Sequence, residues 1–457
     1  MKSLKYTFFT TISLCLFIHT TTPAQQWVNP NYDNHRLDCR DLGYPSQNMI
    51  PADNSYITSL LSHSNGLIYG ATSGKTQSYL FLYYKYVNKV RPLGKIADQK
   101  GVHHGLLEGK DGEIYIGTGL NMFAPVKLTK DFPVQKFAIE NQLWKDICAP
   151  YADYDGGHIY RYIPKTGDVR RYKIEDPCPV EDLGIPVPKN TIYAMTMNPK
   201  KTIIYGITYP EAHFFVFDIA SKKTRDIGDF LGKKVYNGPE RHWRTVPRAL
   251  YCDPETGYVY TSGNNGFIFR FNPITDKFEK TKIRLPGEYW ERLKSEDYPV
   301  VEFFDTDCEG NLYAATNDGY LIKICLETED RIVLGKPRVM RRCRAMKVGK
   351  DHKIYMITGE LDKICKLHTY DLAEKGGFTE LGLFAVDRSP YYQENAFSLD
   401  CMAIGTDGTV FCGESDRRGK LYLYIPGSDT FKGDYNPTNP VIQRMDYDTP
   451  ALIPESL

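Results

Sequence analysis

Side chains that could transfer protons or hold an anion recur along this 457-residue sequence. Imidazole and phenol groups act as general acids and bases in proteins. The arginine guanidinium binds a carboxylate through two parallel N–H donors, a geometry that lysine lacks. Indole and phenol rings also offer stacking surfaces for sugars. The candidates of these kinds are His103, His104, His158, His213, Tyr209, Trp243, Arg244, Arg248 and Arg344.

Each candidate also has a structural interpretation. A histidine beside a strand often only bonds to the backbone. Burying an arginine is costly unless an anion neutralises it, so the partner of Arg248 or Arg344 could be a carboxylate such as Glu302 or Asp400. The choice between chemistry and structure therefore depends on the elements that position these groups.

A repeated unit of four short strands supplies those elements. One complete copy runs from Thr191 to Gly228, with strands expected at 191–197, 202–208, 213–217 and 223–227, rich in β-branched and aromatic residues and separated by turn residues. The second strand carries an aromatic residue at a fixed place, and this signature recurs at Tyr69, Tyr115, Tyr205, Tyr260, Tyr313, Tyr355 and Phe411.

The spacings between these aromatics are 46, 90, 55, 53, 42 and 56 residues. Each except the 90 is typical of one blade of a β-propeller. The segment 157–164 matches 266–273, which follows a second-strand signature and is therefore a third strand. The long spacing is thus a blade with an insertion at 119–155. The sequence predicts an all-β fold, a seven-bladed β-propeller, over residues 51–435.

The ends of the chain carry separate signals. Residues 1–24 combine Lys2 and Lys5 with an apolar run and a small-residue cleavage site, which predicts a signal peptide and an exported protein, periplasmic or secreted. Residues 25–50 read as an N-terminal strap that leads into the first blade, and 436–457 as a C-terminal tail. No later stretch is long and apolar enough for a membrane span.

Charge and cysteine content narrow the function classes. Lys plus Arg (57) and Asp plus Glu (56) nearly cancel, which argues against nucleic acid as a partner. Cys148 and Cys178 are a candidate disulfide around the insertion, although buried free thiols are expected for most cysteines. The sequence has no metal-binding motif of the Cys-x-x-Cys or His-Glu-x-x-His kind.

Propeller geometry gathers the candidates on one face. First strands line the central channel, and their starts share a rim with the loops between second and third strands. That rim should hold every candidate named above, together with Tyr193, Glu302, Arg342 and residues 391–395. Because adjacent residues of a strand point to opposite sides, one of His103 and His104 should face the channel. His158 and His213 occupy the same third-strand place as Phe267 and Tyr320, which favours packing for at least one of them.

The sequence resembles exported seven-bladed polysaccharide lyases, a group that includes ulvan lyases and rhamnose-glucuronate lyases. The resemblance covers most of the propeller and rests on His-His-Gly-Leu at 103–106, Gly-Gly-His-Ile-Tyr at 156–160 and Ile-Thr-Tyr-Pro at 207–210. It implies His104, His158 and Tyr209 as catalytic residues, with His213 as the alternative to His158. Arg248 and Arg344 match the family's arginines by strand position only.

The reaction that the resemblance implies is β-elimination at a uronic acid, with a uronate-containing polysaccharide or oligosaccharide as partner. Arginines neutralise the carboxylate, and a base and an acid move the protons. The chemistry requires no cofactor and no catalytic metal, and a structural divalent metal stays open. Two alternatives remain: a non-catalytic glycan- or protein-binding propeller, and a glycoside hydrolase whose acids come from Glu360, Asp362, Glu394 or Glu414.

Overall fold

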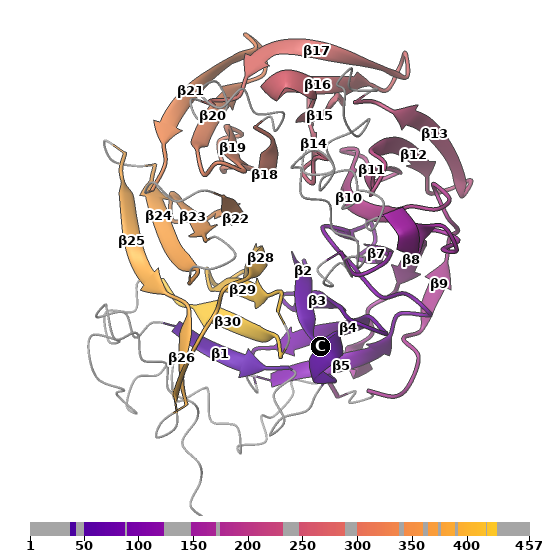
Figure 1. Cartoon of the computed structure of the whole chain (residues 1–457), viewed down its shortest axis with the longest axis vertical. Coiled ribbons are helices and arrows are strands. Elements are labelled where there is room, and N and C mark those ends of the chain that lie inside the picture. Colours follow the sequence, from indigo (N-terminus) through magenta and orange to yellow (C-terminus); the bar gives the residue numbers. More distant parts are fainter. Residues whose placement is uncertain are drawn as a thin grey trace, which may run out of the picture.

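The computed structural model is a single ring of β-sheets around a central channel (Figure 1). It describes residues 37–42, 50–86, 89–122, 148–170, 174–231, 246–287, 299–337, 342–359, 364–372, 376–388, 392–416 and 418–426. The predicted signal peptide, the predicted tail and the candidates Trp243 and Arg244 lie outside the described residues.

Seven four-stranded antiparallel sheets form the ring, which confirms the predicted seven-bladed β-propeller. In each blade the first strand lies at the channel and the fourth at the outer edge (Figure 1). Blades 1 to 3 contain β2 (Tyr56–Ser62), β3 (Ile68–Ser73), β4 (Tyr79–Tyr84) and β5 (Lys89–Lys95); β6 (Leu106–Glu108), β7 (Ile114–Gly117), β8 (Ile159–Tyr162) and β9 (Val180–Asp182); β10 (Thr191–Met197), β11 (Ile203–Tyr209), β12 (His213–Asp218) and β13 (Lys223–Asp229).

The remaining four blades follow in chain order. Blades 4 to 6 contain β14 (Tyr251–Cys252), β15 (Val259–Ser262), β16 (Phe267–Asn272) and β17 (Lys277–Arg284); β18 (Val301–Thr306), β19 (Leu312–Thr316), β20 (Leu321–Cys325) and β21 (Asp330–Gly335); β22 (Cys343–Val348), β23 (Lys353–Thr358), β24 (Lys366–Asp371) and β25 (Phe378–Leu383). Blade 7 contains β28 (Leu399–Ile404), β29 (Val410–Glu414), β30 (Lys420–Tyr424) and β1 (Leu37–Asp41), and a separate hairpin joins β26 (Ala385–Arg388) to β27 (Tyr392–Asn395). Short 3-10 helices lie at Ala52–Asn54, Ala149–Tyr151, Thr166–Arg170 and Asn264–Gly266.

An N-terminal strand closes the ring. β1 pairs with β30 from Leu37↔Tyr424 to Asp41↔Lys420 and so becomes the outermost strand of blade 7. Part of the segment expected as a strap is therefore a strand of the last blade. The first and last parts of the propeller are joined by backbone hydrogen bonds, which removes a free end from the ring.

The long spacing in blade 2 falls inside one sheet. β7 and β8 are neighbours with Ile116 opposite Tyr160, although 41 residues separate Gly117 from Ile159 in the sequence. Tyr160 is thus part of blade 2, and the described residues contain no separate sheet around it. The described ends of the connecting segment lie near the channel, because the His103 Nε2–H donates to the Leu120 carbonyl at 2.9 Å.

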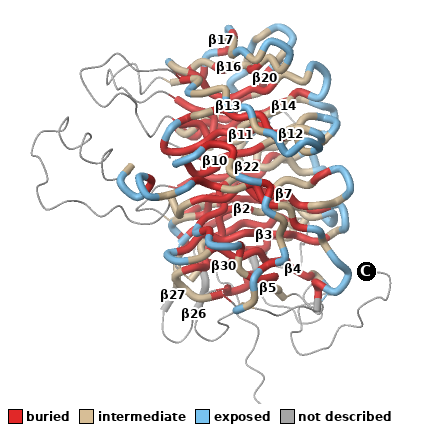
Figure 2. The backbone as a smooth tube through the Cα atoms, turned by 90° about the vertical axis from the view of Figure 1, so that its right-hand side faces the viewer, coloured by how far each residue is buried: buried red, intermediate tan, exposed pale blue. Residues whose placement is uncertain are grey.

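Aromatic and aliphatic side chains fill the space between neighbouring blades. Seen from the side, buried backbone lies in the middle of the ring and exposed backbone at its surface (Figure 2). All seven second-strand aromatics are buried. A glycine in the second strand makes room for an inward aromatic of the third: a Cβ on Gly206 would lie 2.2 Å from the Phe215 ring. The repeat therefore encodes the packing between strands and between blades.

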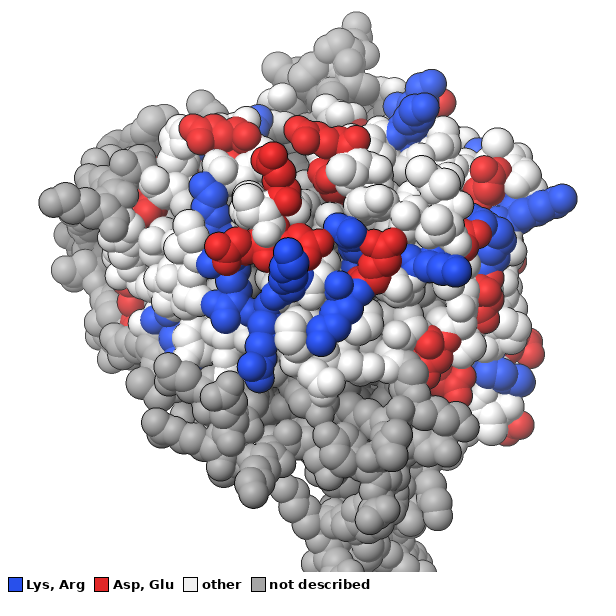
Figure 3. All heavy atoms as spheres, turned by 90° about the horizontal axis from the view of Figure 1, so that it is seen from above, with Lys and Arg blue, Asp and Glu red and all other residues white. Residues whose placement is uncertain are grey.

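The outer surface is electrostatically mixed. Blue and red side chains are interspersed on the side of the ring formed by β17 and its neighbours (Figure 3). Arg270, for example, pairs with Glu279 at 2.8 Å and with Glu329 at 2.9 Å. No helix of the described part is long and apolar enough to cross a membrane.

None of the ten described cysteines forms a disulfide, and six of them are buried. Cys148 and Cys178 therefore do not form the candidate disulfide, and burial of most thiols agrees with the sequence expectation.

Candidate functional site: a polar ring in the central channel

A β-bulge interrupts the first strand of five blades at the level of the channel. Pairing with the second strand skips one residue in blades 1, 3, 5, 6 and 7. A bulge re-aims the extra residue and is frequent beside active sites. The skipped residues are Thr58, Tyr193, Glu302, Arg344 and Asp400.

The same position in the other two blades completes the set. Gly117 pairs with Gly105 and Gly119 with Gly101, which leaves His103 and His104 at this level of blade 2. The register of β14 with β15 places Arg248 at this level of blade 4. We call Thr58, His104, Tyr193, Arg248, Glu302, Arg344 and Asp400 the polar ring.

Its members lie 11 or 12 positions before the second-strand aromatic of their blade. That offset is the sequence signal that would have grouped Tyr193, Glu302 and Asp400 with the candidate histidines and arginines.

His104 and Tyr193 are joined through their backbones. The His104 N–H donates to the Tyr193 carbonyl at 3.2 Å, and the Met195 N–H donates to the His104 carbonyl at 3.1 Å. Their ring centroids are 6.4 Å apart. Neither the imidazole nor the phenol hydroxyl has a hydrogen-bond partner among the described residues, and both side chains are only partly buried. The two groups are thus held side by side, with their polar atoms free for a ligand.

The environment of these two groups sets their protonation. Burial and the charge of Arg248 hold the pKa of His104 well below its ordinary value, so the imidazole is neutral at pH 7. Burial raises the pKa of the Tyr193 phenol, which keeps its proton. Burial likewise lowers the pKa of His103 to about 4. A neutral imidazole can accept a proton, and a protonated phenol beside it can donate one.

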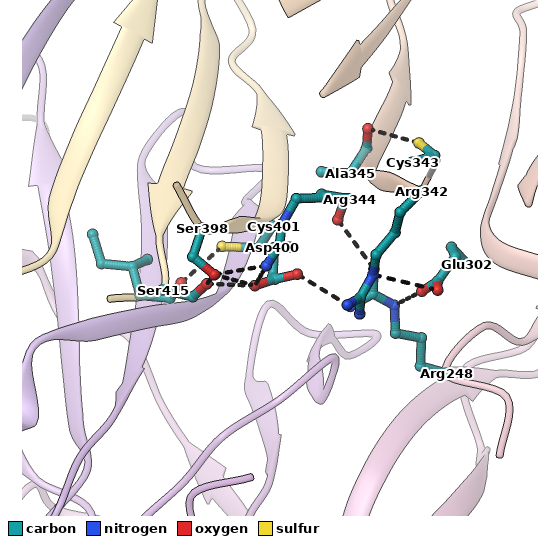
Figure 4. A network of polar contacts seen from close by, with 11 residues as sticks. Arg248, Glu302, Arg342, Cys343, Arg344, Ala345, Ser398, Asp400, Cys401 and Ser415 are labelled. Carbon is teal, nitrogen blue, oxygen red and sulfur yellow. Dashed lines mark hydrogen bonds and ion pairs between the residues drawn. The ribbon is translucent and has the colours of Figure 1, made fainter. Parts of the chain in front are cut away.

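Two arginines of the ring are neutralised by carboxylates of the ring (Figure 4). Arg248 forms an ion pair with Glu302 and reaches Asp400 at 3.4 Å, while Arg344 reaches Asp400 at 2.8 Å. Ser415 also donates to Asp400. All four charged side chains are buried, and the neighbouring arginines lower the pKa of Asp400 despite its burial. The carboxylate partners considered from the sequence for Arg248 and Arg344 are therefore present in the chain itself.

Arg342 is the more accessible arginine beside this network. Its side chain is 36% exposed, and its Nε lies 3.7 Å from Glu302, beyond hydrogen-bond distance. Its φ of 73° lies in the left-handed region, which is uncommon for residues other than glycine and often occurs at functional sites. The Nε of Arg342 thus has no hydrogen-bond partner among the described residues, and the same holds for Nε and Nη1 of the buried Arg344.

The channel at this level is narrow. Phe303 of blade 5 crosses it, with its ring 5.5 Å from His104 and 4.9 Å from the Arg248 guanidinium carbon. The cavity has a volume of about 180 Å³ and is lined by first-strand residues of all seven blades. This is smaller than the roughly 300–1,000 Å³ of most small-molecule sites. A wider cavity of about 980 Å³ opens near the other ends of the first strands and shares Leu60, Leu106 and Lys347 with the channel.

His158 and His213 lie outside the ring. His158 donates to Asp182 at 2.9 Å, and His213 donates to Asp226 at 2.9 Å, each across to the outer strand of its blade. In both blades the carboxylate also accepts the N–H of a glycine two residues on. Because β8 and β12 are third strands, two strand spacings, about 10 Å, separate them from the first strands. The repeated arrangement is typical of a blade-stabilising contact, and the structure does not bring these histidines to His104.

Tyr209 supports the site from behind. Its buried ring packs 5.6 Å from Tyr193 and 6.3 Å from Tyr151, which belongs to the described end of the blade 2 insertion. The structure therefore joins His103, His104, Tyr193 and Tyr209 in one cluster, with Tyr193 between His104 and Tyr209.

The carboxylates considered for hydrolysis are placed differently. Glu414 and Glu394 lie 2.8 Å and 3.1 Å from the buried Lys420 ammonium group. Glu360 and Asp362 lie outside the described residues. Within the described ranges, no group of three or more His, Cys, Asp or Glu side chains is arranged to hold a metal ion.

Comparison with known proteins supports the fold. No protein-family model matches the sequence, and no curated protein resembles it significantly. The structure is similar to virginiamycin B lyase from Staphylococcus aureus, with a TM-score of 0.52 and 12% identity over 85% of this chain and 98% of that chain. A catalytically inactive variant of that lyase with quinupristin gives a TM-score of 0.51 and 11% identity, covering 85% and 99%.

A third similar structure is the extracellular domain of a hybrid two-component system from B. thetaiotaomicron. Its TM-score is 0.51 at 14% identity, over 88% of this chain and 39% of that chain. At these identities the similarity establishes the class of fold, a seven-bladed β-propeller, and the argument for function rests on the channel residues.

Proposed function

We propose that the protein is an exported polysaccharide lyase that cleaves a glycosidic bond to a uronic acid by β-elimination. The observation that carries this proposal is the pair of His104 and Tyr193. They lie side by side in the channel, one neutral and one protonated, and neither has an internal hydrogen-bond partner among the described residues. General acid and base groups of this kind are the requirement of an elimination reaction.

The roles follow from the protonation states. His104 removes the proton on the carbon next to the uronate carboxylate, and the electrons of that C–H bond form a carbon–carbon double bond. The bond from the neighbouring carbon to the glycosidic oxygen breaks, and the departing oxygen takes the Tyr193 proton. The proton on His104 returns to Tyr193 through solvent. A bound carboxylate would raise the pKa of His104 and make it a stronger base when substrate is present.

Arg342 is the proposed partner of the substrate carboxylate. The proton to be removed becomes acidic enough only when that carboxylate is neutralised, and a guanidinium supplies two aligned donors. Arg248 and Arg344 then act indirectly, because their paired carboxylates hold the polar ring together. This assignment replaces the two buried arginines by Arg342 as the carboxylate-binding group.

Two further observations support the proposal. Virginiamycin B lyase is a lyase built on a similar fold, and replacing one histidine by alanine gives the catalytically inactive variant named above. The predicted signal peptide and the similarity to an extracellular domain favour export.

A recognition propeller is the second candidate. In its favour, carboxylates of the chain itself neutralise Arg248 and Arg344. A ligand that is only bound would leave these ion pairs of the polar ring unchanged. Product mass separates the candidates after incubation with arabinogalactan, ulvan and pectic fragments. A lyase yields fragments whose masses sum to that of the substrate, a hydrolase adds one water per bond, and a recognition propeller yields no fragments.

A further inference from the structure

The imidazole of His104 has no hydrogen bond that fixes its orientation. The Tyr193 carbonyl and the Met195 N–H hold its backbone, but neither ring nitrogen has a hydrogen-bond partner among the described residues. In most catalytic histidines, a hydrogen bond to the second ring nitrogen sets the tautomer and the orientation of the ring. A different contact is therefore needed to hold the plane of this ring if His104 acts as a base.

Phe303 makes such a contact from the far side of the channel. His104 belongs to blade 2 and Phe303 to blade 5, three blades further around the ring (Figure 1). Their ring centroids are 5.5 Å apart with an interplanar angle of 88°, an edge-to-face arrangement that aromatic rings favour. The Tyr193 ring is farther away, at 6.4 Å. Of the two described rings that contact the imidazole, Phe303 is thus the closer.

The Phe303 ring is itself fixed from its own side of the channel. Its backbone in β18 pairs with Ala315 directly after the bulge at Glu302. The guanidinium carbon of Arg248 lies 4.9 Å from the ring centroid, within the range of a cation–π interaction. Arg248 is in turn held by the Glu302 carboxylate and donates to the Arg344 carbonyl at 3.2 Å. A continuous set of contacts therefore runs from the buried ion pairs through Phe303 to the imidazole.

We propose that Phe303 is the positioning residue of the base His104. This inference rests on the proposed function. The side chains of Phe303, His104 and Arg248 line the same narrow cavity, where the phenyl ring takes the place of a hydrogen-bond partner and holds the imidazole in one orientation. An apolar ring does so without adding a charge beside the base. Orientation matters for rate because a misplacement of about 1 Å can cost about 100-fold.

Phe303→Leu tests this role, because it removes the ring and keeps an apolar side chain. On uronate oligosaccharides from arabinogalactan, ulvan or pectin, we expect kcat to fall about 10- to 100-fold and KM to stay within about threefold. Phe304→Leu is the matched control. Phe304 is the next residue of β18 and also lines the cavity, but its ring contacts Tyr251, at 6.3 Å, and not His104. The control variant should keep kcat within about threefold.

Crystal structures of both variants test the positioning without substrate. We expect the His104 imidazole to occupy more than one orientation in Phe303→Leu and to keep its original orientation in Phe304→Leu. Phe303 also packs against two hydrophobic clusters, so the variant could lose stability for that reason alone. Phe303→Met fills more of the space that the ring leaves, and it takes the place of Phe303→Leu if that protein does not fold.

The outcomes separate the inference from the proposed function. An unchanged kcat in the folded Phe303 variant, equal losses of kcat in the Phe303 and Phe304 variants, or a single unchanged imidazole orientation overturns the positioning role and leaves the lyase assignment standing. Absence of cleavage of all three glycans by the intact protein overturns the proposed function, and the inference with it.

Discussion

The His104 N–H donates to the Tyr193 carbonyl at 3.2 Å, so the first strands of blades 2 and 3 are bonded to each other beside the channel. In every blade the first strand pairs with the second strand of its own blade, and this bridge between two blades is additional. Here the backbone contact fixes the spacing of the two proposed proton-transfer groups. Their relative position therefore depends on the fold and not on a loop.

Replacing Tyr193 by Phe should lower kcat by about 10²- to 10⁴-fold with little change in KM, because only the proton donor is lost. Steady-state kinetics on a uronate oligosaccharide measures both constants. Tyr209→Phe is the matched control and should keep most of the activity, since its ring packs against Tyr193. If Tyr209→Phe is inactive and Tyr193→Phe is active, Tyr209 is the acid, as the family resemblance implied.

Arg344→Met should destabilise the fold by about 3–5 kcal/mol, because it leaves the buried Asp400 without its closest cation. Denaturant unfolding measures the change. Arg225→Met is the control on the outer strand β13, where the side chain is 53% exposed, and should cost less than about 1 kcal/mol. A stable Arg344→Met protein that has lost only activity would return Arg344 to the role of substrate ligand.

His158→Ala and His213→Ala should each lower stability by about 1 kcal/mol, through loss of one hydrogen bond to the outer strand, and leave kcat unchanged within about twofold. Thermal unfolding and initial rates check the two effects separately. A loss of kcat in His158→Ala comparable to that of a His104 variant would show that the second catalytic histidine is His158.

Stability should fall as the pH is lowered through the range from about 6.5 to 4. His103 has a folded-state pKa of about 4, below its unfolded value, so the unfolded chain binds the proton first. Its contribution is complete above about pH 6.5 and is lost progressively below it. His104 acts in the same direction. His103→Gln should flatten this slope in unfolding experiments between pH 4 and 7, and an unchanged slope would contradict the assignment.

The fold was largely predictable because each blade repeats the same packing. The aromatic of the second strand is buried in every blade, so its spacing reports the blade count directly. The expected strand at 191–197 coincides with β10, and the other three strands of that unit agree within about two residues. The role of β1 was not predictable from local pattern, because its partner β30 lies more than 370 residues away.

The site was predictable only in part. The histidine pair marks the channel level of blade 2, but the partners of the arginines depend on distant residues: Asp400 lies 56 positions from Arg344 and 152 from Arg248. Glu302 and Asp400 were considered as partners from the sequence, but nothing near an arginine shows whether it pairs with a carboxylate of another blade or with a ligand. Tyr193 was harder than Tyr209 to identify as a site residue, because a bulge between Ile192 and Ala194 decides where its side chain points.

Ultraviolet absorbance during incubation with uronate-containing glycans tests the central claim most directly. Elimination creates a carbon–carbon double bond conjugated to the carboxylate, which absorbs in the ultraviolet, whereas hydrolysis creates no such bond. We predict a rise in absorbance with the intact protein and none with His104→Ala, provided that the variant unfolds at the same denaturant concentration. Cleavage without new absorbance, or an equal rise with folded His104→Ala, would contradict the account.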